Sequence, residues 1–264
     1  MKKLLIFLAL LISLQGFGQT VLTSGSTVLK VYDNQQPLNI ETTCEVWLDG
    51  KDAGQFTLDG TYVDDWIGKG SLGVHVVNTN DNTTRPTYDS NTGRVTFIDG
   101  NSTFLQSAAF ASALTQPNTI FIVYKITGTL GTLEFVFEGL NAANRNTFYY
   151  QNTFRIRSDA ELRDGANDNN DNIHTALFNG ATSEYWINGI SVVSGNAGAD
   201  QLSGITLGSY YGIDNYFSDV EICEVIVYNA DISDVDRDKI TGYLADKWSI
   251  TATTDFKGYV LRQD

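Results

Sequence analysis

The 264-residue chain is poor in the residue types that bind metals and nucleic acids. It has two cysteines and two histidines, which excludes zinc fingers, iron–sulfur clusters and most histidine-rich metal sites. Its 17 basic side chains are outnumbered by 31 acidic ones, giving a net charge of −14, and no basic cluster is present. A nucleic-acid partner is therefore not expected. An anionic membrane surface is disfavoured for the same reason.

Long apolar runs are also scarce. The one candidate, Leu4–Leu14, follows a short basic start and is followed by small residues up to Gly18. This pattern predicts a secretory signal peptide over residues 1–18, with Gln19 as the new N-terminus. The run is too short to span a bilayer comfortably. We therefore expect an exported protein, periplasmic or extracellular at the cell surface, that is not an integral membrane protein.

The remaining chain is typical of an all-β protein. The full sequence is 42 % hydrophobic and 18 % charged, so the protein can bury a core and is not expected to be disordered. Short runs of β-branched and aromatic residues recur between turns rich in Gly, Asn and Asp, as in a sandwich or barrel. The clearest hairpin is predicted at Trp186–Ser191, where Asn188-Gly189 separates two alternating runs and favours a type I′ turn.

One helix is predicted, near the C-terminus. Ser233 is a good N-cap, and Asp234 and Asp236 in the first turn favour the helix dipole. Three apolar residues then recur every four positions and form one stripe: Ile240, Leu244 and Trp248. We expect the helix to pack this stripe against the outside of a β-sandwich.

The residues around this helix carry a family resemblance. Glu224–Tyr228, Asp231–Asp234 and Tyr243–Trp248 together resemble the C-terminal signature of laminin G-like domains, within the concanavalin A-like lectin/glucanase superfamily. Earlier in the chain, Val46–Gly50 and Val95–Gly100 are similar to further motifs of that family, in the same order. The superfamily is functionally broad, so the resemblance does not settle function.

The resemblance implies a fold and a domain layout. We expect a two-sheet antiparallel jelly-roll sandwich of the concanavalin A-like kind, with one short C-terminal helix. The laminin G-like domain would span residues 44–250. An N-terminal extension, 19–43, would precede it as an arm that could reach a partner, and a tail, 251–264, would follow.

The carboxylates of a glucanase are not found in the expected pattern. Glucanases of this superfamily use Glu-x-Asp-x-Glu, which places three carboxylates on one face of a strand. In the nearest run, Asp219 and Glu221 alternate, but the third position is Cys223. Glu224 would lie on the opposite face, and the resemblance makes it a structural residue of the last strand. We therefore expect no glycosidase activity.

Tyrosines and arginines supply the candidate ligand site. Arg155 and Arg157 alternate on one predicted strand near Tyr149, and Tyr210-Tyr211 forms a second aromatic group. Sugar rings stack on exposed aromatic side chains, and arginine binds acidic sugars bidentately. These five residues are therefore predicted to bind a glycan. The alternative is that half of the rings fill the core.

A polar loop between Asp164 and Asn172 is dense in oxygen ligands suited to Ca²⁺. Asp164, Asn167, Asp168 and Asp171 are the candidate ligands, and calcium is the one cofactor that the sequence suggests. The loop lacks the spacing and the bidentate glutamate of an EF-hand, so a solvated loop without metal is the alternative.

The two cysteines form an even set in a predicted exported protein. Cys44 and Cys223 each precede Glu-Val in a predicted strand, and the resemblance implies that the first and last strands are neighbours. We therefore predict a disulfide that closes the sandwich. The alternative is two separate buried thiols.

These expectations favour a secreted, non-catalytic module that binds a glycan or a surface protein. Two alternatives stay open. One is a structural or adhesion subunit of a surface assembly or virion, in which the domain forms oligomers. The other is a polysaccharide-degrading enzyme whose site has no recognisable motif. His75 and His174, the only histidines that could act as a base in such an enzyme, are predicted to be surface or packing residues.

Overall fold

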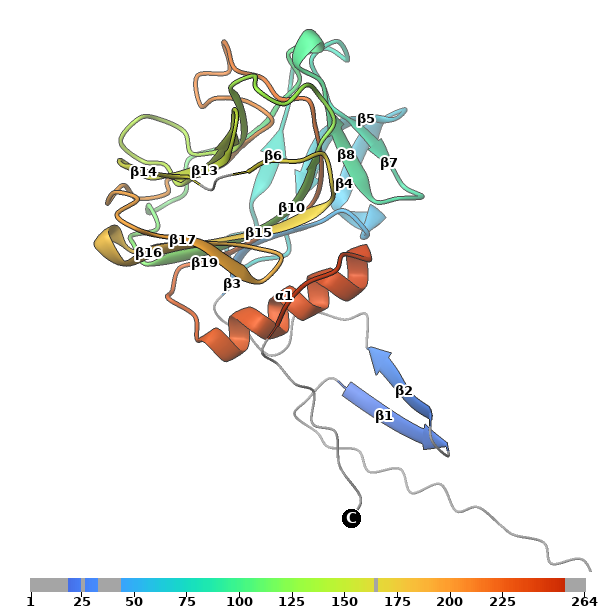
Figure 1. Cartoon of the computed structure of the whole chain (residues 1–264). Helices are drawn as coiled ribbons and strands as arrows, with labels where there is room; N and C mark the ends of the chain where they lie inside the picture. Colours follow the sequence, from blue (N-terminus) through green and yellow to red (C-terminus); the bar gives the residue numbers. More distant parts are fainter. Residues whose placement is uncertain (1–18, 25–26, 33–43, 164–165, 255–264) are drawn as a thin grey trace, which may run out of the picture. The chain divides into compact units, whose positions relative to one another are not determined.

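The computed structural model describes residues 19–24, 27–32, 44–163 and 166–254 (Figure 1). The chain divides into two units, Met1–Glu41 and Thr42–Asp264. In the first unit, β1 (Gln19–Ser24) pairs antiparallel with β2 (Thr27–Tyr32). The predicted signal peptide, residues 1–18, lies outside the described residues.

Over its described residues, the second unit is an all-β antiparallel sandwich with a single short helix near the C-terminus (Figure 1). In one layer the strands pair in the order β17–β16–β15–β10–β19, and β3 and β8 share the far edge of β19. The bounds are β3 (Cys44–Asp49), β8 (Arg94–Phe97), β10 (Asn118–Ile126), β15 (Asn172–Phe178), β16 (Ser183–Ile187), β17 (Ile190–Gly195) and β19 (Val220–Tyr228).

The other layer pairs in the order β14–β13–β12–β11–β18–β9–β6–β5–β4, and β7 joins β5 to β8. Its strands are β4 (Phe56–Asp59), β5 (Tyr62–Ile67), β6 (His75–Val77), β7 (Thr87–Asp89), β9 (Leu105–Ser107), β11 (Glu134–Glu138), β12 (Thr147–Tyr150), β13 (Phe154–Arg157), β14 (Glu161–Arg163) and β18 (Thr206–Leu207). Three short 3₁₀ turns lie at Ala53–Gln55, Asp99–Asn101 and Gly180–Thr182.

Strand alternation assigns each side chain to the core or to an outer face. Ile120 and Ile122 of β10 meet Phe148 and Tyr150 of β12 in one apolar cluster between the layers, and all four are fully buried. Because successive side chains on a strand point to opposite faces, the residues between them, such as Tyr149, lie on the outer faces.

The predicted helix is confirmed as α1 (Asp234–Trp248), with Ser233 as its N-cap. The three stripe residues, Ile240, Leu244 and Trp248, are buried. Trp248 Nε1 donates to Glu224 of β19 at 2.7 Å, and the Arg237 guanidinium lies 4.3 Å from the ring centre of Trp186 in β16. The helix therefore covers the outer face of the β19-containing layer, as expected.

No helix among the described residues is long and apolar enough to cross a membrane.

The hairpin predicted at Asn188-Gly189 is confirmed between β16 and β17. Both turn residues have positive φ, 51° and 80°, as a type I′ turn requires. The turn also supports the segment after α1, because Thr253 N donates to Asn188 O at 2.8 Å. A Cβ atom on Gly189 would overlap the carbonyl oxygen of Thr253.

Gly189→Ala is expected to destabilise the protein by about 2–4 kcal/mol, the sum of left-handed backbone strain and overlap with Thr253. Urea unfolding measures the change. Gly180→Ala is the matched control, because Gly180 also has positive φ, 55°, but a Cβ there meets nothing within 4 Å. Equal losses in the two variants would show that the Thr253 contact contributes nothing.

The predicted disulfide between Cys44 and Cys223 is wrong. Their strands, β3 and β19, are neighbours as expected, but the antiparallel register places Cys44 opposite Tyr228 and Asp49 opposite Glu224. Five residues of strand then separate the cysteines, about 17 Å at 3.3–3.4 Å per residue, whereas a disulfide needs Cα atoms within about 7 Å. Both side chains are buried and no disulfide joins them.

Candidate functional site

The outer face of β11, β12 and β13 brings an arginine onto an aromatic stack. Tyr149 pairs with Arg155 of β13 on one side and with Phe135 of β11 on the other. The Phe135 and Tyr149 rings stack with centres 5.0 Å apart and planes within 7°. The Arg155 guanidinium lies 5.7 Å from the Tyr149 ring centre. Arg157 follows two positions later and shares this face.

The second predicted group joins the same stack from the connection between β18 and β19. The Tyr210 ring lies 5.1 Å from Phe135, and Tyr211 lies 4.0 Å from Tyr210. Tyr216 completes the group, 6.0 Å from Tyr210. We call this surface the aromatic–arginine face; its members are Phe135, Arg145, Tyr149, Arg155, Arg157, Tyr210, Tyr211 and Tyr216. The fold thus brings together two groups of residues about 60 positions apart in the sequence.

The rings of this face differ in what they can contact. Tyr149 is only 4 % exposed, and its hydroxyl donates to Glu161. Burial raises the pKa of Tyr149 well above its usual range. Its ring supports Arg155 and cannot offer a broad stacking surface, which differs from the sequence prediction. Tyr210 and Tyr211 are half-buried and Tyr216 is 47 % exposed, so these three supply the accessible aromatic surface.

The arginines of the face differ in the number of hydrogen bonds and ion pairs that they make. Arg155 Nη1 lies 3.3 Å from Glu161 Oε2. Arg157 is half-buried and makes no hydrogen bond or ion pair with the described residues. Arg145 was not predicted, because it lies in an irregular turn without periodicity. Its buried side chain lies 3.5 Å from Glu138 and 5.7 Å from the Tyr211 ring centre. Its Nε and Nη1 have no hydrogen-bond partner within the described part of the chain.

The residues predicted to bind calcium have protein partners. Arg94 binds both oxygens of Asp171, at 2.7 and 3.0 Å. Asn167 Nδ2 donates to the carbonyl oxygen of Gln151 at 2.9 Å. Asp164 lies outside the described residues, and within them no group of three or more His, Cys, Asp or Glu side chains could hold a metal. Calcium binding by this loop stays a prediction.

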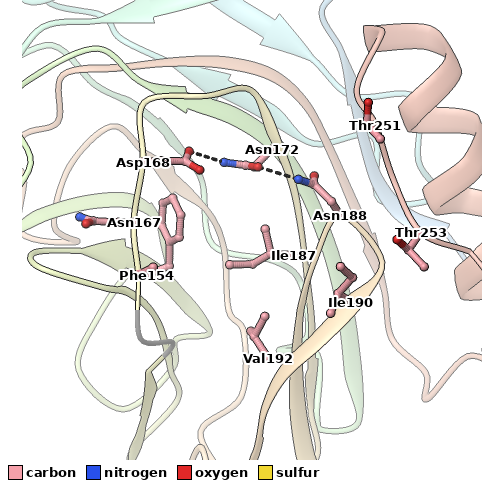
Figure 2. Close-up of a pocket in the computed structure, with 11 residues that line it drawn as sticks. Phe154, Asn167, Asp168, Asn172, Ile187, Asn188, Ile190, Val192, Thr251 and Thr253 are labelled. Carbon is pink, nitrogen blue, oxygen red and sulfur yellow. Dashed lines mark hydrogen bonds between the residues drawn. The ribbon is translucent and has the colours of Figure 1, made fainter.

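A cavity of about 380 Å³ lies beside the same loop (Figure 2). Its lining comes from β13, the segment 166–172, the β16–β17 hairpin and the chain after α1: Phe154, Ala166, Asn167, Asp168, Asn172, Ile187, Asn188, Ile190, Val192, Thr251 and Thr253. A chain of side-chain hydrogen bonds runs along one wall. Asn188 Nδ2 donates to Asn172 Oδ1 at 2.7 Å, and Asn172 Nδ2 donates to Asp168 Oδ1 at 2.8 Å (Figure 2).

The carboxylates nearest to the glucanase pattern have structural partners. Asp219 accepts a hydrogen bond from Asp99 N at 2.9 Å, and Glu221 lies 3.0 Å from Arg94. Glu224 is fully buried under α1, where burial raises its pKa. It accepts hydrogen bonds from Trp47 Nε1 at 2.8 Å and Trp248 Nε1 at 2.7 Å. Asp219, Glu221 and Glu224 therefore each have different neighbours and do not meet around one substrate position.

Comparison with known proteins shows the fold but no family. No family model matches the chain, and no curated protein matches it. The solved structure of Trypanosoma rangeli sialidase in complex with sialic acid is similar, with a TM-score of 0.55 and 13 % identity over 80 % of this chain and 34 % of the sialidase. The botulinum neurotoxin serotype D binding domain has a TM-score of 0.58 and 10 % identity, over 77 % of this chain and 52 % of that one.

A further serotype D structure, the ligand-binding domain in complex with N-acetylneuraminic acid, has a TM-score of 0.57 and 10 % identity. It aligns with 77 % of this chain and 51 % of its own. Our chain therefore spans about a third of the sialidase and about half of the toxin domains. At these identities the likeness shows a shared β-sandwich fold.

Proposed function

We propose that this protein is an exported, non-catalytic module of the laminin G-like, concanavalin A-like kind that binds glycans carrying acidic sugars. One observation carries the proposal: the fold gathers accessible tyrosines and arginines onto one outer face. Tyr210, Tyr211 and Tyr216 offer ring surface for a sugar, and Arg145 lies over the Tyr211 ring. Arg157 lies on the outer face of β13 two positions after Arg155 and has no ion pair among the described residues. Aromatic rings with an adjacent arginine suit a sugar ring with a carboxylate or sulfate.

The two outer faces of the sandwich differ in a way that supports this assignment. Helix α1 covers the outer face of the β19-containing layer, where Phe121 and Ile226 are fully buried. On the β12-containing layer, the outward-pointing residues include Arg155 and Arg157, which are only half-buried. Three of the solved structures with a similar fold are named as complexes with sialic acid or N-acetylneuraminic acid, or as a binding domain. These names agree with the proposal, although the likeness itself extends only to the fold.

The non-catalytic part of the proposal rests on the surroundings of the carboxylates. Most retaining and inverting glycosidases use two carboxyl groups that face one substrate across a gap of about 5–9.5 Å. Glu224 is enclosed by Trp47, Trp248 and Lys247 beneath the helix. Glu221 is paired with Arg94. Neither residue faces the aromatic–arginine face.

Arg157→Ala is expected to weaken binding to acidic glycans about tenfold or more, because a hydrogen bond to a charged group contributes about 1.5–3 kcal/mol. A glycan array of sialylated, uronate-containing and neutral glycans, followed by calorimetry on the strongest hit, measures the change. The melting temperature should fall only slightly, because Arg157 has no ion pair to lose among the described residues and acts on Glu138 and Asp200 only through its charge.

Lys239→Ala is the control, since Lys239 lies on α1, which covers the opposite outer face of the sandwich, and pairs there with Asp236. It should bind like the unaltered protein. A blank array, or equal binding by the Arg157→Ala and unaltered proteins, would contradict glycan binding at this face.

A further inference from the structure

The cavity beside β13 and the β16–β17 hairpin is separate from the aromatic–arginine face and has the opposite electrostatic character. Its described lining contains one ionisable side chain, Asp168, and no lysine or arginine. Hydrogen bonds from Asn170 N and Asn172 keep the pKa of Asp168 below its usual value, although burial opposes them. The cavity therefore presents an anion at neutral pH and disfavours anionic ligands.

Hydrogen bonds within the protein hold the polar wall of the cavity, Asp168, Asn172 and Asn188, in a fixed orientation without a ligand. Asn188 is fixed at both ends, because its Oδ1 accepts from Ile173 N at 2.8 Å while its Nδ2 donates to Asn172. Asn172 in turn donates to Asp168 Oδ1, which also accepts from Asn170 N at 2.9 Å. Both of these hydrogen bonds end on Oδ1. Among the described residues no hydrogen bond reaches Asp168 Oδ2, so this oxygen is left as an acceptor for a ligand.

The rest of the lining restricts the shape of the ligand. Ile187, Ile190 and Val192 form an aliphatic wall (Figure 2), and Ile190 is 54 % exposed. The one aromatic residue of the lining, Phe154, is 3 % exposed, so the cavity offers no ring face on which a planar base could stack. Thr251 and Thr253, both exposed residues, also line the cavity and add hydroxyl groups to it. A volume of about 380 Å³ is at the small end of ligand pockets.

From these features we propose that the cavity is a second binding site, which takes a neutral, saturated, hydroxyl-rich ring such as a hexopyranose. Asp168 Oδ2 accepts a hydrogen bond from one or two ligand hydroxyls. The aliphatic wall covers the C–H face of the ring. The site is independent of the proposed acidic-glycan site, because it uses none of the same residues.

The test is a chemical-shift titration of the ¹⁵N-labelled protein with methyl β-glucopyranoside, methyl β-galactopyranoside and methyl α-mannopyranoside, and with glucuronic acid as the anionic comparison. At least one neutral glycoside should shift the side-chain amides of Asn167, Asn172 and Asn188 saturably. Glucuronic acid should shift them at least tenfold more weakly. No saturable shift of these amides by any of the glycosides, or equal binding of glucuronic acid, would overturn the proposal.

Asp168→Asn sharpens the test because it keeps an oxygen for the Asn170 and Asn172 hydrogen bonds and replaces only the second oxygen. We expect it to weaken glycoside binding at least tenfold, since a charge-assisted hydrogen bond is lost. Asp231→Asn, at an exposed acid outside the cavity, should bind like the unaltered protein. Unchanged binding by Asp168→Asn would overturn the assignment of Oδ2. Arg157→Ala should leave this titration unchanged, so failure at one site is distinguishable from failure at the other.

Discussion

Replacing Lys247 with methionine is expected to destabilise the protein by about 3–5 kcal/mol, because it leaves a buried carboxylate without its cation. Lys247 Nζ lies 2.8 Å from Glu224 Oε2 and 2.6 Å from Asp49 Oδ1, so it joins α1 to both β19 and β3. It also donates to the hydroxyl of Tyr243 at 2.8 Å. Glu224 is fully buried, and without Lys247 only neutral donors would face it.

Lys239→Met is the matched control, on the same helix. Lys239 pairs with Asp236 at 3.0 Å but both side chains reach solvent, and such surface pairs contribute about 0.3–0.5 kcal/mol. Chemical denaturation of both variants measures the difference. Adding Glu224→Gln to Lys247→Met should recover part of the loss, because the uncompensated charge is then removed. A Lys247→Met protein as stable as Lys239→Met would contradict this account of the helix anchor.

The loss in Lys247→Met should also depend on pH. Burial raises the pKa of Glu224 in the folded protein, and removing Lys247 takes away the charge that opposes this rise. A carboxyl with a raised folded-state pKa stabilises the fold below its unfolded pKa, and this stabilisation is lost as pH rises through the folded value. The destabilisation by Lys247→Met should therefore be smaller at pH 5 than at pH 8.

Acidification from pH 7.5 to 4.5 is expected to cost the unaltered protein about 2–3 kcal/mol of stability through His174 alone. His174 is fully buried, and burial lowers its pKa from 6.5 to about 3. Its ring stacks on Tyr124 with centres 4.1 Å apart, and its Nδ1 lies 2.6 Å from the Tyr185 hydroxyl. The Nε2 atom has no hydrogen-bond partner among the described residues.

The direction of this effect follows from proton binding. The unfolded chain protonates His174 as pH falls below 6.5, whereas the folded chain keeps it neutral down to about pH 3. The stabilisation is therefore complete above pH 6.5 and is lost progressively between pH 6.5 and about 3.

Between pH 7.5 and 4.5, the free energy of unfolding of His174→Phe should fall by about 2–3 kcal/mol less than that of the unaltered protein. Urea unfolding at each pH measures both. Carboxylates also titrate in this range, so the comparison is made between variants at the same pH. Equal slopes in His174→Phe and the unaltered protein would contradict a neutral buried His174.

The candidate site was predictable in part. Tyr149 and Arg155 are near each other in sequence, so alternation on adjacent strands was enough to group them. Their meeting with Tyr210 and Tyr211 depends on Phe135, which joins the two groups in space. Arg145 had no periodic signal, and the cavity is assembled from four separated segments. Neither could be found from residue spacing alone.

Features that depend only on neighbouring residues could be predicted from the sequence. The Asn188-Gly189 turn, the capped helix from Ser233 and the all-β class each follow from local backbone preferences and side-chain periodicity, and the structure confirms them. Features that depend on the pairing and packing of distant strands became visible only in the folded structure. Antiparallel pairing placed Cys44 opposite Tyr228 instead of Cys223, and packing buried the Tyr149 ring that its sequence context predicted to be accessible. Pairing between strands that no short turn connects, and the burial of a single ring, are set by contacts between residues far apart in the chain, which local preferences do not specify.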